Sequence, residues 1–287
     1  MKKVTLFLAV ILLVTGCAKK EALVPVRVHI NDFSISQEEI PSKTASDVVD
    51  YTGVKAITLA FYTADGTEQY KVTQMRADAT TYTTFGEFDL SLPMGSYTMV
   101  VLGYGLNDGE PAITLTGPTS ATFGDYPARE TFVATQAVSI TNTDALELNA
   151  TLNRVVAKLK VLSTDGRTAN ANSVRITTSG GSKAFNPSTG LATTNTGFSN
   201  TVNITSTAVG SVAGPVSYLF LATDEQTVNV TIDVLDENNQ TISHKEVNNV
   251  PLQRNRMTKL VGSIFTASGD GSFQVETEWL PETEVNF

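Results

Sequence analysis

Few residues in this chain have the types and spacing that catalysis or metal binding requires. The chain has two histidines, His29 and His244, and one cysteine, Cys17, so the side chains that hold zinc are few and far apart. The stretch 210–214 has valine where a nucleophile elbow has serine, and neither a phosphate-binding loop nor a complete calcium loop occurs. We therefore expect no catalytic residue, no metal site and no cofactor, and a protein that is not an enzyme.

The chemistry that the sequence does support is lipid attachment at Cys17. Two lysines precede an apolar stretch, residues 4–14, which has the form of a secretory signal peptide. At roughly 1.5 Å per residue this stretch is too short to span the ~30 Å hydrocarbon core. It ends in Val14-Thr15-Gly16-Cys17, which resembles the lipobox of bacterial lipoproteins. We predict a signal peptide over residues 1–16, cleavage between Gly16 and Cys17, and lipidation of Cys17 with palmitate.

Charge excludes one large class of partners. The formal net charge is −9, and removal of the two signal-peptide lysines makes it two units more negative. Nucleic-acid binding requires a basic stripe, and none is present. Lys19 and Lys20 alone do not form a polybasic cluster, so the lipid itself must hold the chain at the membrane.

Hydrophobic periodicity indicates an all-β fold. Apolar residues alternate with other residues in many short runs, and after Cys17 no window of 12 or more residues keeps a helical apolar pattern. The runs expected to form strands are Val24–Ile30, Val54–Tyr62, Tyr82–Leu90, Ser96–Leu102, Leu146–Leu152, Val155–Val161, Val216–Ala222, Val228–Leu235, Thr241–Val247, Met257–Phe265 and Phe273–Trp279.

Turn residues divide these runs and indicate antiparallel sandwiches. The stretches 64–67, 164–167 and 237–240 contain Asp-Gly or Asn-Asn and are expected to be hairpin turns. Because Ile57–Tyr62 and Ala157–Leu162 are each followed by Asp-Gly, we predict two similar sandwiches in tandem. The predicted division is a lipidated tether over residues 17–23, an N-terminal domain over 24–149 and a C-terminal domain over 150–287.

Several short motifs resemble the fimbrillin-like lipoproteins of Bacteroidota, which build type V pili. The resemblance adds to the lipobox four stretches that are spread over most of the mature chain. They are Leu92-Pro93-Met94-Gly95-Ser96-Tyr97-Thr98, Leu152-Asn153-Arg154-Val155-Val156-Ala157-Lys158, Val250-Pro251-Leu252-Gln253-Arg254-Asn255-Arg256-Met257-Thr258-Lys259-Leu260, and Phe273-Gln274-Val275 with Trp279. The first also occurs in unrelated prealbumin-like sandwiches, and physically it delivers Tyr97 to a sandwich corner.

The resemblance implies two transthyretin-like β-sandwich domains and a place in a cell-surface fimbria. Family members are outer membrane lipoproteins that polymerise after a protease cuts behind a basic residue and removes the first strand. A strand of the next subunit then fills the groove by β-augmentation. The implied partners are other fimbrial subunits and, through the lipid, the outer membrane.

For this chain, the strand that would be displaced has Val24, Val26, Val28 and Ile30 on one face. The linker after it, residues 31–53, has no arginine and a single basic residue, Lys43. A cut could therefore use Lys43, use Arg27 inside the strand, or not occur. An uncut chain would keep its lipid and suit an anchor at the pilus base.

A second interpretation stays open from the sequence. The lipobox, the acidity and the all-β fold also suit a surface lipoprotein that binds carbohydrate or another ligand without polymerising. Glycan platforms present several exposed aromatic rings, whereas this chain has one tryptophan, so we favour the fimbrial interpretation.

Overall fold

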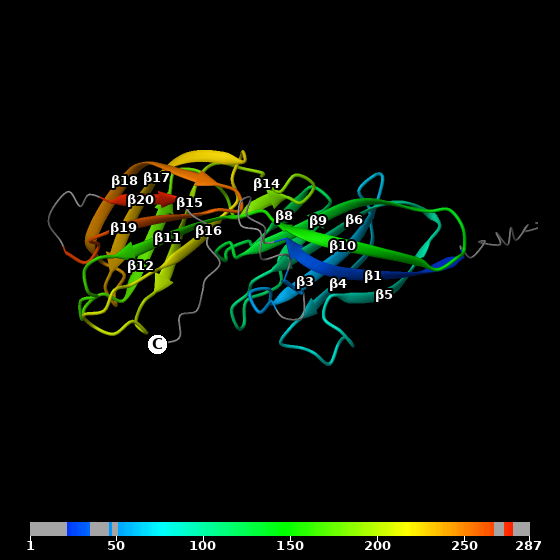
Figure 1. Ribbon diagram of the computed structural model, residues 1–287, viewed down its shortest axis with the longest axis horizontal. Helices are drawn as coiled ribbons and strands as arrows, with labels where there is room; N and C mark the ends of the chain where they lie inside the picture. The colour runs from blue at the N-terminus through cyan, green and yellow to red at the C-terminus, as the bar shows by residue number, and fades with distance from the viewer. Residues whose placement is uncertain (1–21, 35–45, 48–50, 267–272, 278–287) are drawn as a thin grey trace, which may run out of the picture.

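The computed structural model describes residues 22–34, 46–47, 51–266 and 273–277 (Figure 1). All regular structure in these ranges is β-strand, which confirms the predicted fold class. The predicted signal peptide, the cleavage site at Gly16 and Cys17, and the linker residue Lys43 lie outside the described residues. No helix in the described part of the chain is long and apolar enough to cross a membrane.

The N-terminal half, residues 22–154, folds into two facing layers. β9 and β10 pair only through Val133–Asn153 and Phe132–Arg154, so one hydrogen-bonded sheet bends there into two. One layer has the order β5-β1-β10, with the short β2 continuing beside β1, and the other has the order β9-β6-β3-β4. The bounds are β1 (Leu23–Ser34), β2 (Ser46–Asp47), β3 (Ala56–Thr63), β4 (Glu68–Met75), β5 (Glu87–Pro93), β6 (Gly95–Tyr104), β9 (Thr131–Ile140) and β10 (Leu146–Arg154).

The two layers enclose one apolar core, to which alternate residues along the strands contribute. Val24, Val26 and Val28 of β1 pack in the same cluster as Leu59 and Phe61 of β3. At about 1.5–3 kcal/mol for each fully buried aliphatic side chain, this core is a main source of stability for the half.

The C-terminal half, residues 155–277, contains a second pair of four-stranded sheets. Their orders are β16-β11-β19-β20 and β15-β12-β17-β18, and a separate apolar cluster lies between them. The bounds are β11 (Ala157–Ser163), β12 (Ser173–Thr178), β15 (Phe198–Asn203), β16 (Val216–Leu219), β17 (Glu225–Leu235), β18 (Thr241–Gln253), β19 (Met257–Gly262) and β20 (Gln274–Thr277).

A small sheet and a third apolar cluster join the halves. β7 (Thr114–Gly117) and β8 (Ser120–Thr122) pair through β8 with β13 (Ala184–Asn186), which pairs with β14 (Leu191–Ala192). In Figure 1 this sheet lies where the two halves meet. The shared cluster includes Tyr104 and Phe123 of the first half and Phe185 and Phe220 of the second, the last two stacked at 4.1 Å between ring centroids.

The boundary predicted between residues 149 and 150 lies inside β10. This strand stays paired with β1 as far as Asn153, so backbone hydrogen bonding carries the N-terminal sheet past the predicted point. The strand itself ends at Arg154. The division into two tandem domains remains a prediction.

Two of the three predicted hairpin turns are confirmed. Gly66, with a φ of 84°, lies in the turn between β3 and β4, and Asn239, with a φ of 60°, lies between β17 and β18. The third prediction is wrong, because the turn at Asp165 leads from β11 to β12 in the opposite sheet. Tyr97 is placed as expected: its ring is buried and its hydroxyl donates to the Pro93 carbonyl at 2.9 Å.

Asp165 holds the chain that leads out of β19. Its carboxylate accepts hydrogen bonds from the backbone N–H groups of Ile264, Phe265 and Thr266, each at 2.9 Å. Burial by itself would raise the pKa of Asp165, but hydrogen bonds from Ser263 and these backbone groups lower it below its ordinary value. The charged carboxylate is therefore the form that the fold stabilises.

Replacing Asp165 with alanine is expected to lower the free energy of unfolding at pH 7 by about 1–3 kcal/mol, a range that allows for partial solvent screening. In the unchanged protein this contribution is complete above the ordinary carboxyl pKa of about 3.9 and is lost as the pH falls through the lowered native value. Urea titrations at pH 7 and at pH 3 measure both effects. An Asp165→Ala variant that loses as much stability at pH 3 as at pH 7 would contradict this role.

Candidate functional site

The predicted first strand is a central strand of its layer. β1 pairs in parallel with β10 on one side and antiparallel with β5 on the other, for example Val28 with Leu148 and with Phe88. Val24, Val26, Val28 and Ile30 all point into the core, with relative exposures of 0%, 2%, 0% and 6%. The four residues predicted from the sequence therefore lie together on one buried face, and the groove that they fill runs between β5 and β10.

Arg27, one of the two predicted processing residues, lies in the middle of this strand. Its backbone is paired with Asp89 on one side and Glu147 on the other, and its side chain forms an ion pair with Asp89 at 2.6 Å. A protease must bind its substrate as an extended, unpaired segment, so a cut after Arg27 requires β1 to leave the sheet first. Lys43, the other predicted processing residue, lies outside the described residues.

A buried polar network lies beside the end of the groove. The guanidinium of Arg154, whose side chain is 2% exposed, forms an ion pair with Glu130 at 2.7 Å and lies 4.9 Å from the centre of the Phe132 ring. The Tyr51 hydroxyl donates to the other Glu130 oxygen at 2.7 Å. Burial, followed by the charge of Glu130, raises the pKa of the Tyr51 phenol, which keeps this hydroxyl a neutral donor.

The same arginine reaches the other half of the chain. Arg154 donates to the side-chain oxygen of Asn255, in the turn between β18 and β19, at 3.4 Å. Asn255 belongs to the stretch 250–260, one of the four that carry the family resemblance. Its φ of 58° is the left-handed conformation that asparagine tolerates. The neighbouring Arg254 pairs with Asp224 at 2.7 Å and donates to the Thr189 carbonyl at 2.9 Å. In this motif Asn255 therefore contacts the first half, whereas both partners of Arg254 belong to the second half.

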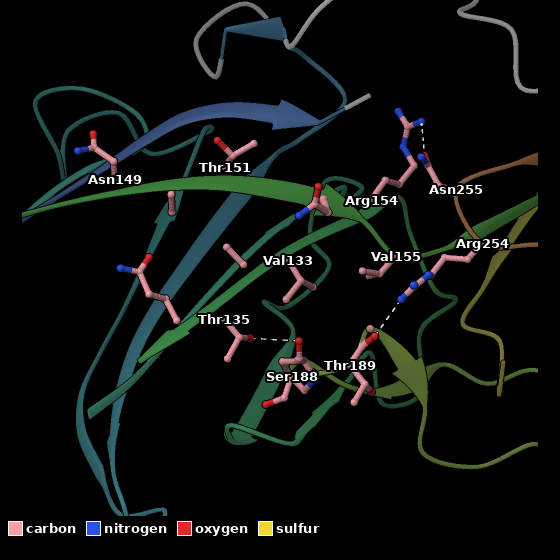
Figure 2. A pocket seen from close by; sticks show the side chains of 16 residues that line it. Val133, Thr135, Asn149, Thr151, Arg154, Val155, Ser188, Thr189, Arg254 and Asn255 are labelled. Carbon is pink, nitrogen blue, oxygen red and sulfur yellow. Dashed lines mark hydrogen bonds between the residues drawn. The ribbon is translucent and has the colours of Figure 1, made fainter. Parts of the chain in front are cut away.

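A polar cleft opens where β9 and β10 separate (Figure 2). It has a volume of about 630 Å³, and its walls come from β9, β10, the 187–190 turn and the turn at Arg254. None of the described lining residues is aromatic or acidic. Half of the lining residues carry an amide or hydroxyl group, namely Thr135, Gln136, Asn149, Thr151, Asn153, Ser188, Thr189 and Asn255, and two carry a guanidinium, Arg154 and Arg254. Chemically, such a cleft can exchange hydrogen bonds with a hydroxylated or peptide ligand.

The two histidines are far apart in the chain and belong to separate sheets. His29 on β1 lies 3.7 Å from Glu87 on β5, and the exposed His244 on β18 has its Nδ1 2.6 Å from Asp233. The hydrogen bond to Asp233, with a second to Glu246, raises the pKa of His244. In the part of the chain that the structure describes, no three His, Cys, Asp or Glu side chains are grouped so that they could hold a metal ion.

The sequence interpretation missed Tyr51, Glu130 and Arg154 as a network. One signal was available, because Arg154 continues the inward phase of Leu148, Ala150 and Leu152. A charged residue at an inward position of a strand requires a buried partner. The sequence did not show that the partner is Glu130, which lies directly before β9, the strand that precedes β10.

Comparisons with known proteins cover nearly the whole chain. One family model, described as "Family of unknown function (DUF6562)", matches residues 26–286, and a search of curated proteins finds no match. A solved Bacteroides ovatus protein described as a "putative adhesin" aligns with a TM-score of 0.52 and 12% identity over 91% of this chain and 96% of that chain. Another from Bacteroides ovatus ATCC 8483 gives 0.50 and 14% over 80% and 83%. The fimbrial anchor protein Mfa2 from Porphyromonas gingivalis gives 0.49 and 14% over 90% and 98%.

At such identities the likeness to the two Bacteroides ovatus proteins shows the fold. At that level it confirms the resemblance to fimbrillin-like proteins of Bacteroidota that the sequence motifs indicated. Because the family model matches all but the first 25 residues and the last one, the chain belongs to the family of unknown function DUF6562.

Proposed function

We propose that this chain is a structural or anchoring subunit of a cell-surface fimbria that assembles by donor-strand β-augmentation. A cell-surface adhesion or fimbrial role fits the fold that it shares with the Bacteroides ovatus proteins, which are described as adhesins. The role is binding and assembly rather than catalysis. The lipid on Cys17 would hold the chain at the outer membrane, and the partners would be other fimbrial subunits.

The observation that carries this proposal is the position of β1 between β5 and β10. A strand with hydrogen-bonding partners on both edges and alternate side chains in the core can be replaced by another strand of the same pattern. Its absence would leave a groove with two unpaired edges, which is a strong template for a strand from another chain. The same geometry explains why an uncut chain would be stable by itself and suit an anchor.

Proteolysis tests whether the chain can polymerise. Treatment of the mature protein with a Lys-specific protease is expected to cut at Lys43, release the first strand and produce a ladder of oligomers on a non-denaturing gel. A Lys43→Gln variant is the matched control and is expected to stay monomeric. A clipped chain that stays monomeric at high concentration would contradict polymerisation.

The carbohydrate-binding alternative has one supporting observation, the polar cleft between β9 and β10. Its amide and hydroxyl side chains suit a hydroxylated ligand, although no described lining residue offers an aromatic ring for stacking on a sugar. Suppose that the clipped chain stays monomeric. Glycan binding by the uncut chain that is lost in an Asn149→Ala variant would then support this alternative.

A further inference from the structure

The end of the β1 groove contains a seat for one aromatic side chain. Phe33 is fully buried there, with ring centres 4.9 Å from Phe132 and 5.8 Å from Tyr51. Its ring lies against the backbone of Gly103, where an added Cβ would be 2.8 Å from the Phe33 ring and 3.1 Å from Leu152. We call Tyr51, Gly103, Phe132 and Leu152 the Phe33 seat. The missing side chain at Gly103 makes the room that the ring occupies.

A β-bulge brings Phe33 into this seat. Ile30 pairs with Ala150 and Asp32 pairs with the next residue, Thr151, so Asn31 is an extra residue in β1. Strict alternation from Val24 to Ile30 would place residues 32 and 34 inward, whereas the bulge shifts the phase and turns Phe33 inward instead. The inward positions of the strand are therefore spaced two, two, two and then three residues apart.

The walls of the seat are fixed rather than adaptable. Tyr51 is held by its hydrogen bond to Glu130, and Glu130 is held by the ion pair with Arg154. The Arg154 guanidinium in turn lies over Phe132. The Phe33 ring is tilted against both aromatic walls. These walls favour a third ring over an aliphatic side chain, because ring pairs of this kind contribute beyond their buried area.

We propose that the Phe33 seat selects which strand can occupy the groove: the strand must present an aromatic side chain three residues after its last inward aliphatic residue, across a bulge. The inference rests on the proposed exchange of β1, and it names the class of partner, a segment of another subunit with this spacing. Strands that alternate without the bulge would leave the seat empty or place a polar residue in it.

The intact chain tests the seat independently of strand exchange. We compare Phe33→Leu, Gly103→Ala and the double variant by urea denaturation of the mature protein. Gly103→Ala is expected to lower the folding equilibrium constant about 10- to 100-fold, because its Cβ would contact the Phe33 ring. In the Phe33→Leu background the same change is expected to cost several-fold less, since the shorter side chain removes the 2.8 Å contact and leaves only the 3.1 Å contact with Leu152. Equal effects in both backgrounds would overturn the seat.

The clipped chain tests selection of the partner strand. After cutting at Lys43, labelled peptides with the sequence of residues 23–34 are added, with phenylalanine or leucine at position 33. The unchanged chain is expected to take up the phenylalanine peptide about 10-fold or more in preference, and the Gly103→Ala chain to reverse this preference. Equal uptake of both peptides would overturn selection. If the effects of Phe33→Leu and Gly103→Ala depend on each other in the intact chain but neither peptide is taken up, strand exchange and the proposed assembly are overturned. The Phe33 seat itself would then still stand.

Discussion

A mature chain shortened to begin after Ser34 is expected not to fold as a monomer. The shortened chain lacks five fully or nearly fully buried side chains, those of Val24, Val26, Val28, Ile30 and Phe33. At about 1.5–3 kcal/mol each, their burial contributes about 8–15 kcal/mol, which equals the whole stability of a typical domain. The loss also leaves the facing edges of β5 and β10 without their partner.

Circular dichroism and size-exclusion chromatography measure this loss, and a peptide with the sequence of residues 23–34 is expected to restore the native signal. A chain that begins at residue 22 keeps β1 and is the matched control. If the shortened chain remained a monomer with the denaturation midpoint of the control, β1 would be dispensable and the groove would have no role in assembly.

Replacing Arg154 with alanine is expected to lower the free energy of unfolding by about 3–5 kcal/mol. The reason is that the carboxylate of Glu130, whose side chain is 13% exposed, would lose its ion-pair partner. The change also removes the hydrogen bond to Asn255 in the second half and the contact with the face of Phe132. The two halves should therefore lose part of their connection together with part of their stability.

Urea denaturation is monitored with one spectroscopic probe in each half. It measures the lost free energy of unfolding and shows whether the two halves still unfold together. Lys71→Ala is the control, because its ion pair with Glu68 is partly exposed at 37% and 42% and such pairs contribute about 1 kcal/mol or less. An Arg154→Ala variant no less stable than Lys71→Ala would show that the network is unimportant for the fold.

Strands with strict alternation were predictable, and polar strands were not. The run Val24–Ile30 predicted β1 because each apolar residue faces the same core. β4 (Glu68–Met75) was missed because it is an edge strand whose residues are mostly partly or fully exposed. The run Tyr82–Leu90 was placed too early, since β5 starts at Glu87 after a turn that contains Gly86 with a φ of 92°.

The sequence predicted the inward residues of β1 but neither Phe33 nor the Arg154 network, for two physical reasons. The four inward residues of β1 follow from period-two alternation, but Phe33 does not, because the bulge at Asn31 changes the phase and a bulge has no reliable sequence signal here. The Arg154 network joins β10 to Tyr51, 103 positions away in the chain. Pairing over such separations depends on topology, which periodicity does not determine.

Native mass spectrometry of strand exchange tests the central claim most directly. Mature protein cut at Lys43 is incubated with excess isotope-labelled peptide of residues 23–34, and the mass of the folded complex is followed with time. We expect one labelled peptide to replace the released strand in each chain, while the uncut Lys43→Gln variant takes up none. A cut chain that keeps its original strand, or that loses the strand and binds no peptide, would contradict assembly by donor-strand β-augmentation.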